Sequence, residues 1–213
     1  LQEHIPSLVP PVNYSLITGG HSNLTYRCED AEGSDYVLRR PPLGHVLQSA
    51  HDMSREHKII DALKDSSVPV ACNYGLYQDS SVNGTDFYVM VYVEGLVLND
   101  STVGAEVPET QRLRIGQHLI DILCRLHAID PDEVGLGDLG RKEAYLGRQI
   151  KRWTTQWEAS KTHEIRAMED SCRILKERMP EQVGAAIVHG DFRLGNMIVG
   201  EGEVKAVLDW ELC

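Results

Sequence analysis

The chain has 213 residues, 42% of them hydrophobic and 25% charged, as in ordinary folded proteins with one large domain or two small lobes. Its formal net charge of -11 argues against non-specific binding of DNA or RNA, which needs a basic surface. No apolar run approaches the roughly 20 residues of a membrane span. The sequence therefore predicts neither a nucleic-acid nor a membrane partner.

The cysteines give no metal or disulfide pattern. There are five, an odd number, and no pair stands close together at a zinc-site spacing. The first residues also lack the basic start and apolar core of a secretory signal. Reduced thiols and a cytoplasmic location are therefore expected.

The first part of the chain is expected to be rich in β-structure. Alternating apolar and polar residues predict strands over 12–18, 23–28, 35–39, 70–77 and 87–93. A helix is expected over 52–63, with Glu56 on the same face as its apolar residues. The polar segment 78–86 is expected to be a hairpin loop.

After Gly95 the pattern becomes helical. A helix is expected to begin at Pro108 and to carry an apolar stripe as far as Leu126. Two more are expected over 142–160 and 163–179, before a return to β-structure from Val183 that includes a hairpin around 200–202. The order predicts an α+β chain: a β-rich lobe and a mainly helical lobe with a cleft between them.

Several side chains in this second part have simple structural interpretations. Trp153 and Trp157, four residues apart, are expected in the core. His127 is expected to be a buried, hydrogen-bonded histidine. The charges between 141 and 152 are expected to form a solvated helix face.

The segment Val188-His189-Gly190-Asp191-Phe192-Arg193-Leu194-Gly195-Asn196 carries the strongest signal for chemistry. The predicted hairpin would place Asn196 opposite Ala206 or Val207 and would bring Asp209 back beside the loop. Asn196 and Asp209 could supply the oxygen ligands that Mg²⁺ prefers. Asp191 could orient an acceptor hydroxyl and take its proton. His189 is expected to hold the loop through hydrogen bonds.

His-Gly-Asp-x-x-x-x-Asn followed by Val-Leu-Asp-Trp-Glu resembles the aminoglycoside phosphotransferase family, which shares the protein-kinase-like fold. The resemblance covers the whole chain. The segments 36–42, 91–95, 126–130 and 145–153 are similar to the branch that contains the kinase-like part of acyl-CoA dehydrogenase family members ten and eleven.

The resemblance implies a two-lobed kinase site. It implies a nucleotide-binding lobe over 1–93 and a catalytic lobe over 94–213, the latter incomplete compared with the family. It makes Asp191 the base and gives Mg²⁺ the ligands Asn196 and Asp209. ATP contacts fall on Gly20, Ser22, Asn23, Arg39, Glu56, Met90, Val91 and Val93.

The implied reaction moves a phosphoryl group from ATP to a hydroxyl of a small molecule. The acceptor stays open between an aminoglycoside-like compound, which would need many acidic residues, and a hydroxyacyl-CoA, which would need a basic patch. The rival hypothesis is a nucleotide-binding pseudokinase or scaffold without turnover. A protein kinase is a weaker third, since Ala-Pro-Glu is missing.

Simpler interpretations of the site residues also remain. Arg39 with Glu56 could be a surface ion pair, although Arg in place of the kinase Lys can fork onto phosphate or Glu56. Gly19-Gly20 could be a plain hairpin turn. Trp210 is expected to be a packing residue that braces Asp209. Glu211 could belong to the surroundings of the metal or could be simply solvated.

Overall fold

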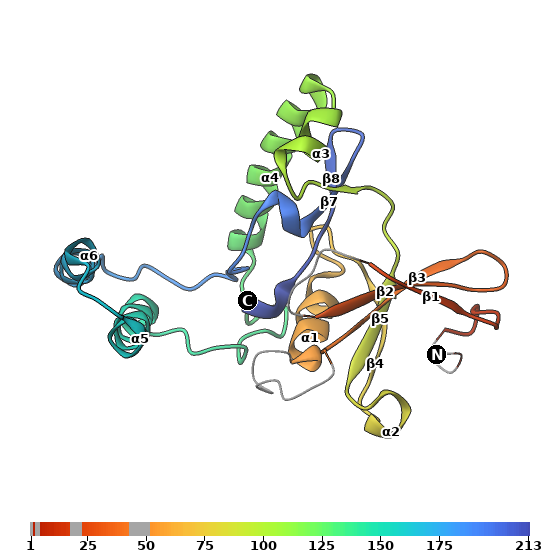
Figure 1. Ribbon diagram of the computed structural model, residues 1–213, viewed down its shortest axis with the longest axis horizontal. Coiled ribbons are helices and arrows are strands. Elements are labelled where there is room, and N and C mark those ends of the chain that lie inside the picture. The colour runs from red at the N-terminus through yellow and green to blue at the C-terminus, as the bar shows by residue number, and fades with distance from the viewer. Residues whose placement is uncertain (1, 3–4, 18–22, 43–51) are drawn as a thin grey trace.

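The computed structural model describes residues 2, 5–17, 23–42 and 52–213. The first half is built on a five-stranded antiparallel sheet with strand order β1-β2-β3-β5-β4 (Figure 1). Its strands are β1 (Asn13–Leu16), β2 (Leu24–Glu29), β3 (Asp35–Arg40), β4 (Asn73–Tyr77) and β5 (Phe87–Val91). All five predicted strands are therefore present, with shifted ends.

The two faces of this sheet bury different side chains. Along β3, Tyr36 and Leu38 face a small cluster with Ile5 and Leu8 from the N-terminal segment. Val37 lies on the opposite face, in the main core. Because side chains alternate along a strand, Arg39 points to the same face as Val37. That face is covered by helix α1.

Helix α1 (Met53–Leu63) begins at Asp52, whose carboxylate accepts hydrogen bonds from the backbone N–H groups of Ser54 and Arg55, both at 3.0 Å. Its buried residues recur at helical spacing, and Glu56 is among them with 1% of its surface exposed. The prediction that Glu56 shares the apolar face is confirmed. A carboxylate thus enters the core directly opposite Arg39.

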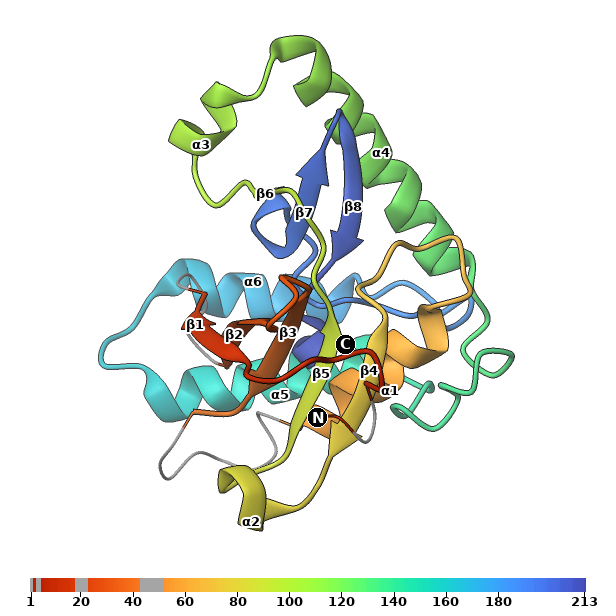
Figure 2. The same ribbon diagram turned by 90° about the vertical axis from the view of Figure 1, so that its right-hand side faces the viewer.

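The second half contains a small sheet with order β6-β7-β8 beside a long helix (Figures 1 and 2). Its elements are β6 (Leu96–Val97), α3 (Ser101–Glu106), α4 (Glu109–Ala128), β7 (Met197–Gly200) and β8 (Glu203–Val207). One hydrophobic core runs from the first sheet through α1 to α4 and the β7–β8 hairpin. Two 3-10 turns, η2 (Leu194–Asn196) and η3 (Trp210–Leu212), flank that hairpin.

Helices α5 (Tyr145–Ser160) and α6 (Arg166–Glu177) pack side by side, and Figure 1 shows them set apart from the rest. Neither helix buries a residue. The prediction that Trp153 and Trp157 lie in the core is therefore wrong, since Trp153 is 57% exposed and Trp157 is only half-buried. His127, near the end of α4, is likewise exposed. Periodicity identifies an apolar face but not what covers it.

Other differences concern short elements. The segment 78–86 holds a helical turn, α2 (Ser80–Asn83), and residues 183–188 do not form the expected strand. Asp100 caps α3 by accepting hydrogen bonds from the backbone N–H groups of Thr102 and Val103. Among the described residues, no helix is long and apolar enough to cross a membrane.

Candidate active site

His189 supports the loop that carries Asp191. Its Nε2 lies 2.8 Å from the carbonyl oxygen of Leu208, and its Nδ1 lies 3.3 Å from the backbone N of Asp191. A neutral ring with its proton on Nε2 satisfies both contacts. Burial lowers the pKa of His189, which favours that neutral form. The ring also packs on buried Trp210, with centroids 4.6 Å apart. The supporting role expected for His189 and the packing role of Trp210 are confirmed.

Gly190 has φ 88°, in the left-handed region. A Cβ at this position would lie 2.7 Å from Cβ of Leu212 and 2.8 Å from its carbonyl oxygen. The loop before Asp191 and the turn after Asp209 therefore touch at a point where only glycine fits.

Asp191 is held by two neighbours. The Nδ2 of Asn196 donates to its Oδ2 at 2.8 Å and to its carbonyl oxygen at 2.9 Å. Nε of Arg193 donates to the same Oδ2 at 3.0 Å. Arg193 is the main cause of a lowered pKa for Asp191, and the Asn196 bond acts in the same direction. Arg193 was not among the residues predicted from the sequence. Its positive charge two residues after Asp191 is the signal that could have identified it.

Asp209 comes back to this loop as predicted. The backbone N–H of Leu208 donates to the carbonyl oxygen of Asn196 at 2.9 Å. The ladder pairs Met197 with Val207, so Asn196 lies opposite Leu208 rather than opposite Ala206 or Val207. Asp209 itself has φ 65° and ψ 59°, a left-handed conformation that is unusual outside glycine. Such backbone is kept only where the surrounding contacts determine it.

Arg39 joins the first sheet to Asp209. Its Nη2 donates to Oδ1 of Asp209, and its Nε lies 3.0 Å from Oε2 of Glu56 as an ion pair without hydrogen-bond alignment. The side chains of Arg39 and Glu56 are 12% and 1% exposed, so the surface ion-pair interpretation is wrong. Burial raises the pKa of Glu56, and the charge of Arg39 opposes that rise. Oε1 of Glu56 accepts a hydrogen bond from the backbone N of Trp210 at 3.2 Å.

Asn23 contacts the same segment from the start of β2. Its Nδ2 donates to Oε2 of Glu211 at 3.0 Å. Asn23 is buried. Gly20 and Ser22, the other expected contacts in this turn, lie outside the described residues.

Met90, Val91 and Val93 lie at the end of β5 and the start of the connection to β6. The side chain of Met90 is part of the main core, and Val93 packs against that core. The N–H of Val91 donates to the carbonyl oxygen of Cys72 at 2.9 Å. The N–H of Val91 is therefore not free to contact a nucleotide base.

The candidate metal ligands are one amide and one carboxylate. In the part of the chain that the structure describes, no group of three or more His, Cys, Asp or Glu side chains could hold a metal ion. Asn196 directs Nδ2 to Asp191, so Oδ1 is its remaining ligand atom. Together with Asp209 it offers the hard oxygen donors that suit Mg²⁺, which takes its other ligands from phosphates and water.

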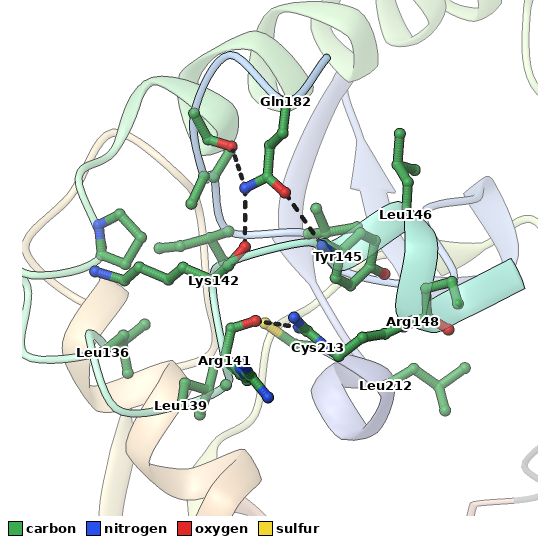
Figure 3. A pocket seen from close by; sticks show the side chains of 18 of the residues that line it. Leu136, Leu139, Arg141, Lys142, Tyr145, Leu146, Arg148, Gln182, Leu212 and Cys213 are labelled. Atoms are coloured by element: carbon green, nitrogen blue, oxygen red, sulfur yellow. Dashed lines mark hydrogen bonds between the residues drawn. The ribbon is translucent and has the colours of Figure 1, made fainter. Parts of the chain in front are cut away.

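A cavity of about 600 Å³ opens beside the loop that carries Asp191. Leu212 and Cys213 line one side of it, and the segment leading into α5 lines another (Figure 3). Val188, just before the Asp191 loop, also lines it. Its cationic lining residues are Arg55, Arg141, Lys142, Arg148 and Arg152, and Glu181 is the one acid among its described lining residues. The charges of 141–152 are partly a solvated face, since Arg141 and Glu143 are exposed and lie 3.8 Å apart as an ion pair. Lys142 pairs with Asp132 at 2.6 Å, so Arg148 and Arg152 are the cations of this segment that give the cavity its basic character.

The cavity wall is held by specific bonds. Nε2 of Gln182 donates to the carbonyl oxygens of Lys142 at 2.8 Å and Gly184 at 3.0 Å, and Oε1 accepts from the backbone N of Tyr145 at 3.1 Å (Figure 3). Arg148 donates through Nη2 to the carbonyl oxygen of Arg141. These bonds connect the segment before the Asp191 loop to the start of α5.

Comparison with known proteins gives relatives over nearly the whole chain. Acyl-CoA dehydrogenase family member 10 of Mus musculus is 40% identical over 195 residues, which are 91% of this chain and 18% of that protein. Probable acyl-CoA dehydrogenase IBR3 of Arabidopsis thaliana is 37% identical over 207 residues, 91% of this chain and 25% of that protein. The chain thus spans a quarter or less of these curated relatives.

Solved structures share the fold. A crystal structure described as a candidate aminoglycoside phosphotransferase from Ralstonia eutropha JMP134 is 35% identical, with TM-score 0.85 over 99% of this chain and 62% of that one. The streptomycin–ATP complex of APH(2")-IIa, at 20% identity and TM-score 0.63, agrees in fold. The predicted kinase-like, two-lobed α+β fold is confirmed. The family model described as "Phosphotransferase enzyme family" matches residues 13–213, and the chain belongs to that family.

Proposed function

We propose that this chain carries the catalytic machinery of an ATP-dependent phosphotransferase that acts on a hydroxyl of a small molecule. The observation that carries the proposal is the joining of Asp191, Asn196 and Asp209 around His189, with Arg39 reaching Asp209 from the first sheet. The residues that would bind the nucleotide lie in the first part of the sequence. Those that would act on the acceptor lie near its end. A lobe boundary between 93 and 94 is part of this proposal.

Asp191 orients the acceptor hydroxyl and takes its proton. It is suited to this role because it is half-exposed and because its lowered pKa keeps it ionised at neutral pH. Arg193 and Asn196 fix its carboxylate, so the proton is accepted in one geometry. Arg193 also places a cation beside the position where phosphate charge would build up.

Asn196 and Asp209 would hold Mg²⁺, which when bound neutralises phosphate charge. Arg39, which bonds to Asp209 and pairs with Glu56, would also hold phosphate oxygens. The backbone around Met90, Val91 and Val93 would contact adenine. The turn with Gly20, Ser22 and Asn23 would lie over the phosphates. Five free cysteines accord with a cytoplasmic location.

The basic cavity favours an anionic acceptor. Arg148 and Arg152 would repel the ammonium groups of an aminoglycoside and attract phosphate or carboxylate. A hydroxyacyl-CoA carries such groups, and the names of the curated relatives connect this branch with acyl-CoA chemistry. We therefore propose hydroxyacyl-CoA or a related anionic hydroxy compound as acceptor.

Two assays test the reaction. A thermal-shift titration with Mg·ATP measures binding, and ATP consumption is measured with a hydroxyacyl-CoA, a free hydroxy acid and an aminoglycoside. Asp191→Asn should bind Mg·ATP and lose turnover by about 10²-fold or more, whereas the exposed Asp121→Asn serves as the matched control. Binding without consumption across a broad panel would favour the pseudokinase. Equal turnover by Asp191→Asn and wild type would refute the role of Asp191.

The acceptor class is tested by reversing charge in the cavity. Arg148→Glu should raise KM for an anionic acceptor by about tenfold while KM for ATP stays the same. Arg166→Glu on α6 is the matched control, because that side chain is 95% exposed and outside the cavity. Consumption of ATP with aminoglycosides alone would contradict the anionic acceptor.

A further inference from the structure

The segment from Asp209 to Cys213 is held from the first half of the chain at nearly every residue. Arg39 bonds to the carboxylate of Asp209, and Glu56 accepts from the backbone of Trp210. Arg55 donates to the carbonyl oxygen of Cys213, through Nε at 3.2 Å and through Nη2. Oε2 of Glu211 accepts a hydrogen bond from Nδ2 of Asn23 at 3.0 Å. Of these contacts, the Asn23–Glu211 bond has no assigned role.

We infer that Asn23 and Glu211 form a tether that positions Asp209 for the metal-bound nucleotide. This inference rests on the proposed function. Glu211 is a positioning residue that acts through the backbone it shares with Asp209. Asn23, which also belongs to the turn proposed to lie over the phosphates, acts on Asp209 through Glu211. The hydrogen bond to Asn23 argues against the interpretation of Glu211 as a simply solvated side chain.

The backbone conformation of Asp209 explains why such a tether is needed. At φ 65° this residue occupies a conformation that side chains other than glycine seldom adopt, so neighbouring contacts must maintain it. Arg39 holds the side chain of Asp209, and Glu56 holds the backbone N–H of Trp210. Asn23 holds the side chain of Glu211. Three successive residues are thereby held from the first sheet and its helix.

The sheet register explains how Asn23 reaches this segment. Strand β2 pairs antiparallel with β3, and Thr25 lies opposite Arg39. Asn23 lies in the bend directly before β2, two residues before Thr25, and its side chain contacts Glu211. Arg39 and Asn23 therefore approach residues 209–211 from β3 and from the bend before β2. A bond between a neutral amide and a carboxylate adds direction without neutralising the charge.

The test exchanges donor and acceptor in the full-length protein. Asn23→Asp sets two carboxylates against each other and breaks the bond. Glu211→Gln keeps an oxygen that accepts from Asn23. The double variant Asn23→Asp with Glu211→Gln restores the bond in the opposite direction, because the new glutamine amide donates to the new carboxylate. The double variant also has the same total charge as wild type.

Binding is measured by calorimetry with Mg²⁺ and a non-hydrolysable ATP analogue, so no acceptor is needed. Asn23→Asp is expected to weaken binding by about tenfold, Glu211→Gln to retain most of the affinity, and the double variant to recover most of the loss. Adenosine without Mg²⁺ should bind all four proteins alike. A general loosening of the fold would weaken adenosine binding as well.

The outcomes separate the tether from its alternatives. If Glu211→Gln binds as weakly as Asn23→Asp and the double variant does not recover, Glu211 acts through its charge and the tether is overturned. If Asn23→Asp does not fold, Asn23→Ala and Glu211→Ala replace it: equal losses that do not add in the double variant support the tether, and additive losses refute it. A wild-type protein that binds no Mg·nucleotide would refute the proposed function itself.

Discussion

Nδ2 of Asn196 donates to the carboxylate of Asp191 at 2.8 Å and to the carbonyl oxygen of the same residue at 2.9 Å. One amide thus fixes both the backbone and the side chain of the proposed base. Because Nδ2 of Asn196 points to Asp191, Oδ1 is the atom of this side chain that is left to bind a metal ion. The proposed proton acceptor and the proposed metal ligand are therefore parts of one hydrogen-bonded unit.

Asn196→Ala should damage this unit in two ways. Turnover should fall by about 10²-fold or more, because Asp191 loses its orientation and the metal loses a ligand. Stability should fall by about 1 kcal/mol, because the hydrogen bond from the buried Asn196 side chain to the carbonyl oxygen of Asp191 is lost. Turnover with the accepted substrate and chemical denaturation measure the two effects. Wild-type turnover in Asn196→Ala would contradict the shared unit.

Gly190→Ala should be far more harmful than Gly33→Ala. Both glycines have positive φ, 88° and 82°, so both substitutions carry a similar backbone cost of about 1 kcal/mol. A Cβ at Gly190 meets Leu212 at 2.7 Å, whereas a Cβ at Gly33 meets nothing within 4 Å. Gly190→Ala should therefore lose several times more stability in urea denaturation. Equal losses would show that the loop and η3 do not touch in solution.

Stability should depend on the protonation of His189. Burial lowers its pKa in the folded protein, so the unfolded chain takes up a proton more readily than the folded one. The stabilisation is fully present above the ordinary histidine pKa of about 6.5 and is lost as pH falls through the lower folded value. His189→Asn should therefore lose less stability, relative to wild type, at acid pH than at pH ~7.5. A difference that grows on acidification would contradict a neutral buried ring.

The five thiols should differ in reactivity. Burial raises the pKa of Cys28 and of Cys213 to about 11, so few thiolates form there at neutral pH. Cys72 and Cys124 are exposed. Brief alkylation with iodoacetamide followed by peptide mass spectrometry should label Cys72 and Cys124 and spare Cys28 and Cys213. Early labelling of Cys28 would show that the first sheet opens readily.

The sequence predicted elements with strong periodicity and residues with distinctive spacing. The five strands of the first sheet and the buried Glu56 on α1 follow from alternation and helical spacing alone. The return of Asp209 beside Asn196 follows from the hairpin, with an error of one or two residues in register.

The missed features depend on tertiary contacts. The contact of Asn23 with Glu211 joins residues 188 positions apart, and no local pattern encodes it. Trp153 lies on an apolar helix face that other described elements do not bury, which periodicity cannot reveal. The role of Arg148 in a cavity depends on how residues 181–188 run past α5. In each case the contact depends on the tertiary structure rather than on residues nearby in the sequence.

The most direct test of the central claim is mass spectrometry of a metabolite extract incubated with the full-length protein, ATP and Mg²⁺. Wild type should add one phosphoryl group to an anionic hydroxy compound, and Asp191→Asn should produce at least about 10²-fold less of that product. Asp121→Asn should match wild type. A phosphorylated product formed equally by Asp191→Asn, or no phosphorylated product from wild type, would contradict the account.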